Sequence, residues 1–278
     1  MAHLIVVGAG LAGSALTRIA SSVGHSVTLV SDTQPSTTAA IALLRSGHLP
    51  AEDRPMLAPS LAAWEELGVE VVRGGSVTSY RKPGAEAARQ ADWYGVDPSS
   101  VLLEPDVRST VTTAPVPTSV VVADGELSGD AVVWCTGTGL GRRTYGHTWL
   151  HDDPTALRQP PGTLRLHHIA PYKVLAGVTY RSGARLGSSS ASTLAAARTQ
   201  AQSLMEKALN LGWLSTTDGW HLVSGTRLQR EPGERLRRSP LGAGAWHWSG
   251  FHRTGFGVVP IEAQRVLSTV LAELRVSA

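Results

Sequence analysis

The stretch Leu4-Ile-Val-Val-Gly8-Ala-Gly10-Leu-Ala-Gly13 decides the fold. Its four leading apolar residues are typical of a buried parallel strand, and the glycines open a helix that we expect to run to about Ser22. Gly8 permits a tight turn, Gly10 lets the backbone approach a pyrophosphate, and Gly13 allows the helix to pack closely on the strand. The N-terminus of such a helix presents unpaired N–H groups and a positive dipole end to phosphate.

A second apolar strand, Val27–Val30, follows at the right distance and ends at Ser31-Asp32. An acidic side chain about 20 residues past the glycines holds ribose hydroxyls in dinucleotide-binding proteins. Here Ser31 takes the place directly after the strand, and Asp32 is next to it. The sequence therefore predicts a dinucleotide site made by Gly8, Ala9, Gly10, Leu11, Ala12, Gly13, Ser31 and Asp32.

Composition bounds the class of protein. The 278 residues can bury a sizeable core, and the hydrophobic content of 42% is ordinary for a globular protein. No apolar run approaches the ~20 residues that span a bilayer, no charged segment precedes the first strand, and Cys135 is the single cysteine. We therefore expect a cytoplasmic protein without disulfides or membrane contact. The net charge is +3, and arginine far outnumbers lysine; this reflects either anion binding or a GC-rich coding sequence.

Two further loops follow the pattern of the first. The buried strand Ala131–Cys135 runs into Thr136-Gly137-Thr138, and the glycine-rich stretch Gly250–Gly257 precedes a helix with Pro260 in its first turn. Between them, the small residues of Ser36–Ala40 are either a plain linker or a segment that passes beneath a cofactor through Thr38, Ala39 and Ala40.

Other elements are predicted from periodicity and turn signals. We expect a helix over 53–67 ended by Gly68, a polar surface excursion with one short helix over 82–100, and a hairpin turn at Asp124-Gly125. Residues 141–162 are loop-like, with strands expected over 164–166, 174–180, 184–186 and 220–228, a turn at Ser182-Gly183, and an amphipathic helix over 193–211.

The order of these motifs resembles the flavin-dependent D-amino acid oxidase superfamily, closest to its glycine oxidase and sarcosine oxidase branch. Val6–Gly13 is similar to the FAD pyrophosphate motif, and Glu126–Gly137 resembles the family's return strand. Val178–Ser188 looks like a strand pair of the substrate domain. Gly225-Thr-Arg227 is similar to the "G-x-R-P" strand, and Gly250–Gly255 with Pro260 resembles the loop that lies along the flavin.

The resemblance covers nearly the whole chain and implies a fold. It implies an α/β protein with an FAD-binding, Rossmann-like domain of the glutathione reductase type and an interleaved, smaller α+β substrate domain built on an antiparallel sheet. The FAD-binding domain would take residues 1–75, 101–150 and 245–278, and the substrate domain residues 76–100 and 151–244.

The resemblance also implies site residues, with FAD as cofactor. Arg227 would clamp a substrate carboxylate, for which a guanidinium fork is suited. Arg253 would lie over the flavin or at the substrate mouth, while Tyr172, Tyr180 and His252 would contact substrate or flavin or be structural. The remaining expected cofactor contacts are Val107, Thr136, Gly137, Thr138, Gly250, Thr254, Gly255, Phe256 and Gly257.

Three departures from the family pattern bear on the substrate. The region between Tyr80 and Val120 is shortened, Tyr180 stands where proline is usual, and Leu228 follows Arg227 in place of proline. Cys135 resembles a small residue packed below the cofactor, without a covalent flavin link. His167-His168 has no further ligands near it in the sequence, so no metal is expected.

The implied activity is oxidation of the C–N bond of glycine or a glycine-like amine, with molecular oxygen converted to hydrogen peroxide. The arginine surplus and shortened substrate domain suggest a variant: the glycyl group is carried on a large anion, such as glycyl-thymine in hypermodified phage DNA, leaving aminomethyl-uracil. A flavin- or NAD(P)-dependent dehydrogenase or tailoring enzyme acting on a small metabolite, and a non-enzymatic dinucleotide-binding module, stay open as alternatives. The oligomeric state is left open.

Overall fold

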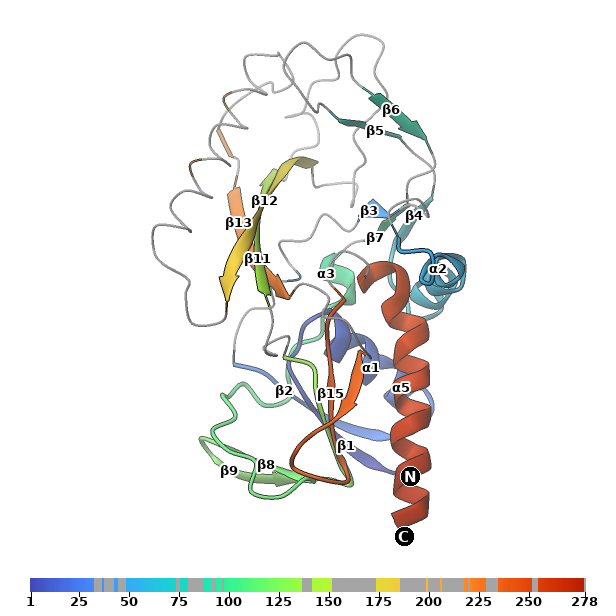
Figure 1. Cartoon of the computed structure of the whole chain (residues 1–278), viewed down its shortest axis with the longest axis vertical. Coiled ribbons are helices and arrows are strands. Elements are labelled where there is room, and N and C mark those ends of the chain that lie inside the picture. The colour runs from blue at the N-terminus through green and yellow to red at the C-terminus, as the bar shows by residue number, and fades with distance from the viewer. Residues whose placement is uncertain are drawn as a thin grey trace.

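The computed structural model describes residues 1–32, 37, 43–44, 49–73, 76–79, 88–91, 94–96, 98–136, 142–151, 174–185, 199, 206, 218–219, 221–228, 235–251 and 255–277. Within these ranges the chain builds a mixed α/β fold around a mostly parallel sheet, as predicted (Figure 1).

The central sheet has the strand order β14-β15-β10-β1-β2. The strands are β1 (His3–Val7), β2 (Ser26–Val30), β10 (Ala131–Trp134), β14 (Leu236–Arg238) and β15 (Ala245–Trp248). Strands β2, β1, β10 and β15 are parallel, and β14 is an antiparallel edge strand. Because β1 and β10 pair in register from Leu4↔Ala131 to Val7↔Trp134, their carboxyl ends lie side by side. This brings the first glycine turn and residue 135 to the same sheet edge.

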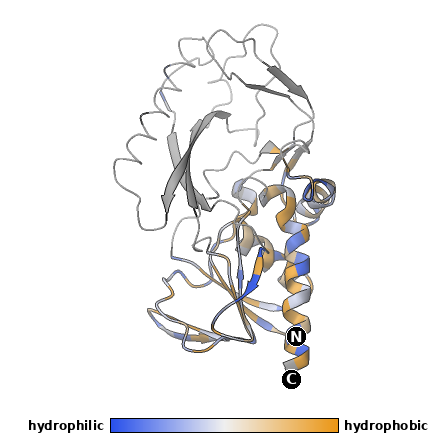
Figure 2. Cartoon of the chain, in the orientation of Figure 1, coloured by the Kyte–Doolittle hydropathy of each residue, from blue (hydrophilic) through white to orange (hydrophobic). Residues whose placement is uncertain are grey.

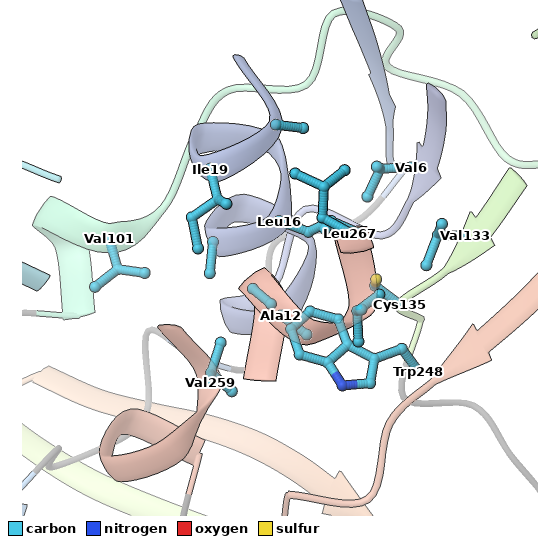
Figure 3. Close-up of a cluster of buried hydrophobic side chains, with 14 of the residues drawn as sticks. Val6, Ala12, Leu16, Ile19, Val101, Val133, Cys135, Trp248, Val259 and Leu267 are labelled. Atoms are coloured by element: carbon cyan, nitrogen blue, oxygen red, sulfur yellow. The ribbon is translucent and has the colours of Figure 1, made fainter. Parts of the chain in front are cut away.

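Helices α1 (Leu11–Ser22) and α5 (Gly255–Ser277) pack against one another over one face of this sheet, and α2 (Leu57–Glu66) packs on α5 after the short 3-10 helix η3 (Arg54–Met56). Polar and apolar residues alternate around α5, as expected of a helix with one buried face (Figure 2). The core between helices and sheet is continuous and includes Val6, Leu16, Ile19, Val133, Trp248, Val259 and Leu267 (Figure 3).

The other face of the sheet carries a smaller apolar cluster. Ile5, Val7, Val30 and Val132 are buried there against Val120 and Val122. The last two belong to the hairpin of β8 (Ser119–Val122) and β9 (Gly125–Ser128), which confirms the turn predicted at Asp124-Gly125. Alternating residues of β1 therefore face opposite cores, as the pleat of a strand buried on both sides requires.

A separate antiparallel sheet has the order β12-β11-β13. Its strands are β11 (Arg142–His151), β12 (Val174–Arg185) and β13 (His221–Leu228). In Figure 1 it lies beyond the end of the central sheet at which α5 begins.

Two predictions were wrong in this antiparallel sheet. The loop expected over 141–162 contains β11, and the turn expected at Ser182-Gly183 lies inside β12, where Ser182 pairs with Thr144. Strand β11 has a neighbour on both sides, and this pairing outweighs its weak local strand pattern. A register shift between Arg142 and Thr144 keeps β12 paired past Gly183.

Short elements lie in the sequence between β2 and β8. They are β3 (Leu43–Leu44), β4 (Val71–Arg73) and β7 (Tyr94–Val96) in one small sheet, the pair β5 (Ser76–Ser79) and β6 (Ala88–Ala91), and α3 (Pro98–Val101). The short helix expected within 82–100 is α3, and the strands β6 and β7 in the same region were not predicted.

The predicted helices are found at the expected places, but the start of the last helix was predicted wrongly. Helix α1 ends at Ser22 and α2 is followed by Gly68 with φ +74°, as expected. Helix α5 begins at Gly255, five residues before Pro260, which therefore lies inside the helix and not in its first turn. The helix expected over 193–211 lies outside the described residues except for Thr199 and Glu206, which are both helical.

The predicted domain boundaries stay a prediction, and the strand pairing adds two facts to them. Strand β11 pairs with β12 and β13, whereas β14 pairs with β15 in the central sheet. Among the residues that the structure describes, no helix is both long and apolar enough to cross a membrane.

Candidate functional site

The first glycine turn joins β1 to α1 by backbone contacts that only glycine allows. Gly8 has φ +108°, and its N–H donates a 2.7 Å hydrogen bond to the carbonyl of Val30. A Cβ on Gly13 would lie 1.9 Å from the carbonyl oxygen of Gly8, well inside van der Waals contact. The two glycines therefore fix how closely the helix can approach the strand, as the sequence motif predicts.

The first turn of α1, at its N-terminus, has no acidic side chain that would compete with a bound anion. Gly10 is the N-cap residue, provides no side-chain cap, and is followed by a first turn without acidic residues. The helix itself offers no acceptor to the N–H groups of its first residues. The N–H of Leu11 donates to the hydroxyl Oγ1 of Thr37 at 3.0 Å. A hydroxyl oxygen thus occupies a position where a phosphate oxygen would accept the same hydrogen bond.

Thr37 was missed by the sequence analysis, which named its neighbours Thr38, Ala39 and Ala40. Those three lie outside the described residues. The signal that could have found Thr37 is the same run of small residues, Ser36–Ala40, because serine and threonine hydroxyls commonly accept hydrogen bonds from a helix N-terminus.

The end of β2 places Ser31 and Asp32 beside the glycine turn. The N–H of Ser31 donates to the carbonyl of Val107 at 3.1 Å, and Asp32 is exposed, with its Oδ2 accepting a 2.6 Å hydrogen bond from the hydroxyl of Thr110. The carboxylate of Asp32 is thus oriented and keeps acceptor capacity for a ligand hydroxyl.

Val107 extends the central sheet beyond β2 by one bridge, to Val30. Its N–H donates to the carbonyl of Leu29 at 3.1 Å, and its carbonyl accepts from Ser31. The Val107 N–H is already bonded, so it cannot donate to a cofactor. Val107 could contact a cofactor only through its half-buried side chain or the second lone pair of its carbonyl.

The second loop follows β10 and begins next to the first loop, which follows the neighbouring strand β1. The N–H of Cys135 donates to the carbonyl of Val7 at 2.7 Å, and a Cβ on Gly8 would lie 3.0 Å from the Cα of Thr136. Burial raises the pKa of the Cys135 thiol far above its ordinary range, so the group stays protonated and packs as a small residue. Gly137 and Thr138 lie outside the described residues.

The third loop also reaches the first. Gly250 has φ +88°, and a Cβ on Gly255 would lie 2.6 Å from Cδ2 of Leu11, the first residue of α1. Phe256 is buried, and a Cβ on Gly257 would lie 3.3 Å from Cδ2 of Leu49. The first turns of α1 and α5 are therefore in contact. His252, Arg253 and Thr254 lie outside the described residues.

Two of the predicted substrate residues, Tyr180 and Arg227, belong to the antiparallel sheet. Tyr180 of β12 pairs with Gly146 of β11, and Arg227 of β13 pairs with Thr144 of the same strand. Residues 180 and 227 therefore lie at register positions two residues apart along β11, on the two strands that flank it. Tyr172 lies outside the described residues.

A cluster of three charged residues was not anticipated. Arg235, which directly precedes β14, bonds to Asp53 before η3 and to Glu262 on α5. Burial raises the pKa of Glu262 above its ordinary value, while the neighbouring Arg235 acts in the opposite direction. In the described part of the chain no group of three or more His, Cys, Asp or Glu residues could hold a metal ion.

Comparison with known proteins relates this architecture to solved structures. No family model matches the sequence, and no curated protein matches it. Glycine oxidase from Geobacillus kaustophilus has a TM-score of 0.66 at 16% identity, covering 98% of this chain and 95% of the other. Iminodiacetate oxidase from Chelativorans sp. BNC1 has a TM-score of 0.63 at 15% identity, covering 97% and 95%.

A third structure is the glycerol-3-phosphate dehydrogenase from Bacillus halodurans complexed with FAD, with a TM-score of 0.61 at 12% identity, covering 99% of this chain and 65% of the other. At these identities the likeness shows the fold. The predicted resemblance to glycine oxidase is confirmed at that level and extends over nearly the whole chain.

Proposed function

We propose that this chain binds FAD and is an oxidoreductase that oxidises the C–N bond of a small amine or amino acid with molecular oxygen as acceptor. The observation that carries the proposal is the meeting of three loops at one sheet edge. A Cβ on Gly8 would meet Thr136 at 3.0 Å, and a Cβ on Gly255 would meet Leu11 at 2.6 Å. The fold likeness to glycine oxidase and to an FAD complex supports the same reading.

The residues at this edge fit FAD. The N-terminus of α1 would hold the pyrophosphate, with Gly10 leaving room for the phosphates, and Asp32 would bind the ribose hydroxyls. The 3.0 Å bond from the Leu11 N–H to Thr37 Oγ1 supports this fit, because a phosphate oxygen could accept the same hydrogen bond from this N–H. The loops after β10 and before α5 would bind the remainder of the cofactor through Thr136 and Gly250.

The chemistry that bound FAD would supply is a two-electron oxidation of the substrate Cα–N bond, with molecular oxygen reduced to hydrogen peroxide. The chain's own residues bind and orient the substrate. Arg227 would hold a carboxylate by two parallel N–H···O bonds, and Tyr180, on the strand at the other side of β11, would be a hydrogen-bonding partner. His252, Arg253 and Tyr172 would complete the site. The oxidised substrate is an imine, and water hydrolyses it to a carbonyl compound and an amine.

For the substrate we propose glycine or a glycine-like amine. In the more specific form of this proposal, the glycyl group is carried on a large anion such as glycyl-thymine in hypermodified phage DNA, and the product is aminomethyl-uracil. The support is compositional: of the 25 basic residues only Lys82, Lys173 and Lys207 are lysines, and arginine suits phosphate.

Oxygen consumption and peroxide release test the proposal. The purified protein is assayed against glycine, N-substituted glycines, other amines and glycyl-thymine DNA. Turnover of the modified DNA with none on free glycine supports the specific form, and the opposite pattern rejects it. Replacing Arg227 by leucine should abolish turnover of carboxylate substrates, whereas Arg227→Lys should retain part of it.

A flavin-dependent dehydrogenase acting on a small metabolite is the second candidate, since the glycerol-3-phosphate dehydrogenase fold also covers 99% of this chain. The two are separated by the acceptor. A dehydrogenase would reduce a dye under nitrogen with the same substrate and would consume little oxygen in air.

A further inference from the structure

Arg235 is a largely buried arginine with two carboxylate partners from distant parts of the chain. Its side chain is 10% exposed. Nη2 donates a 2.6 Å hydrogen bond to Oδ2 of Asp53, which is 3% exposed, and Nη1 donates to Oε1 of Glu262. One guanidinium thus links the segment before η3 to the second turn of α5.

The same residue also holds the segment that leads into the third loop. The N–H of Ser249 donates to the carbonyl of Arg235 at 3.1 Å, and the guanidinium carbon lies 5.5 Å from the centre of the Phe251 ring. Phe251 in turn packs edge-on against Trp248 at 5.1 Å between ring centres. Backbone and aromatic side chain of this segment are therefore both tied to Arg235.

Charge alone does not explain this choice of residue. One arginine faces two carboxylates, so with both carboxylates ionised the cluster has a net negative charge in a buried position, which is an unfavourable arrangement for stability. A planar guanidinium is the cation that can bond two carboxylates along its edges and at the same time present its face to an aromatic ring. The geometry of the cluster points to an orienting role.

We propose that Arg235 is a positioning residue, which holds residues 249–251 and the first turn of α5 where Gly255 meets Leu11. Its consequence for FAD rests on the proposed function, because the contact between Gly255 and Leu11 joins two of the three loops that would bind the cofactor. Substitution of Arg235 should therefore displace the third loop while the overall fold is kept.

Two variants and one control test the inference. Arg235→Gln removes the cation, and Arg235→Lys keeps the charge but loses the planar fork. Arg238→Gln is the control: Arg238 lies three residues further along, pairs with Glu273 of the same helix α5 at 3.1 Å and stacks over Trp246, but it is 65% exposed. Amide hydrogen exchange of residues 249–257 is measured without FAD, together with Tm, and the Kd for FAD is measured by titration.

Arg235→Gln should speed exchange across 249–257 by about tenfold and raise the Kd for FAD by about tenfold, the change expected when a charge-assisted contact is lost. Arg235→Lys should recover most of the Tm, because it restores the charge, while exchange and Kd stay raised. Arg238→Gln should leave the exchange rate and the Kd for FAD as in the wild type.

Wild-type exchange in Arg235→Gln, or full recovery of exchange by Arg235→Lys, would overturn the positioning role. Wild-type protein that does not bind FAD would instead overturn the proposed function. In that case the exchange measured without FAD still decides whether Arg235 positions the loop.

Discussion

The indole Nε1 of Trp64 donates a 2.8 Å hydrogen bond to the carbonyl oxygen of Phe256. This carbonyl has no N–H partner four residues later in α5, because that residue is Pro260. Trp64 is fully buried on α2, so the bond joins α2 to the first turn of α5. It explains how α5 can begin at Gly255 in spite of the proline, and it ties the start of this helix to α2.

Trp64→Phe should destabilise the protein by about 2–4 kcal/mol, because it leaves the Phe256 carbonyl unpaired and opens a small cavity. In a Pro260→Ala background the alanine N–H can bond to that carbonyl. The same Trp64 substitution should then cost about 1 kcal/mol less, measured by a double-mutant cycle in urea. Strict additivity of the two changes would show that the proline and the indole are not coupled.

Gly10→Ala should leave the fold intact and weaken FAD binding. Gly10 has φ −75°, and an added Cβ would lie 3.6 Å from Thr37 Oγ1, an ordinary contact. We expect the free energy of unfolding without FAD to change by less than about 0.5 kcal/mol. The Kd for FAD should rise at least about tenfold, since the methyl group occupies the approach of the pyrophosphate. Unchanged affinity in a flavin titration would place the phosphates elsewhere.

Gly13→Ala is the counterpart that should damage the fold itself. The added Cβ would lie 1.9 Å from the carbonyl oxygen of Gly8, so α1 must move away from β1. We expect a loss of about 3 kcal/mol, seen as a lower Tm with or without FAD. A Tm equal to that of Gly10→Ala would contradict the close packing of helix on strand.

The stability of Glu262 variants should depend on pH. Burial raises the pKa of Glu262 in the folded protein, against the effect of Arg235 and together with the charge of Asp53. Between the unfolded and folded pKa values the folded state binds more protons, so this group makes stability fall as pH rises through that window. Glu262→Gln mimics the protonated form.

The Tm difference between Glu262→Gln and wild type should therefore shift in favour of the variant as the pH rises from about 4 to 7. Thermal melts at a series of pH values measure this shift. A difference that moves in favour of the wild type with rising pH would mean that Arg235 outweighs burial at this site.

The parts of the fold that were predicted are those written in local sequence. The strand, turn and helix of Leu4–Ser22 follow from apolar residues and glycines within one short stretch, and β10 follows from the run Ala131–Cys135. The order of five motifs along the chain, three of them glycine-bearing loops, then predicted the fold that comparison with solved structures shows.

The parts that were missed depend on distant partners. Strand β11 is a strand because β12 and β13 flank it, although Arg142–His151 has no clear alternation. Arg235 and Asp53 are 182 residues apart, so no local pattern announces their ion pair. The early start of α5 depends on Trp64, which is 192 residues from Phe256. The roles of Arg227, Arg253, Tyr172, Tyr180 and His252 stay predictions.

Titration of the cofactor-free protein with FAD, followed by the flavin absorption spectrum, tests the central claim most directly. If the loops at Gly8–Gly13, Thr136 and Gly255 form one cofactor site, FAD binds in a saturable 1:1 complex with a shifted, structured flavin band, and Gly10→Ala weakens it. A protein that stays colourless and leaves the spectrum of free FAD unchanged at saturating concentration would contradict the account.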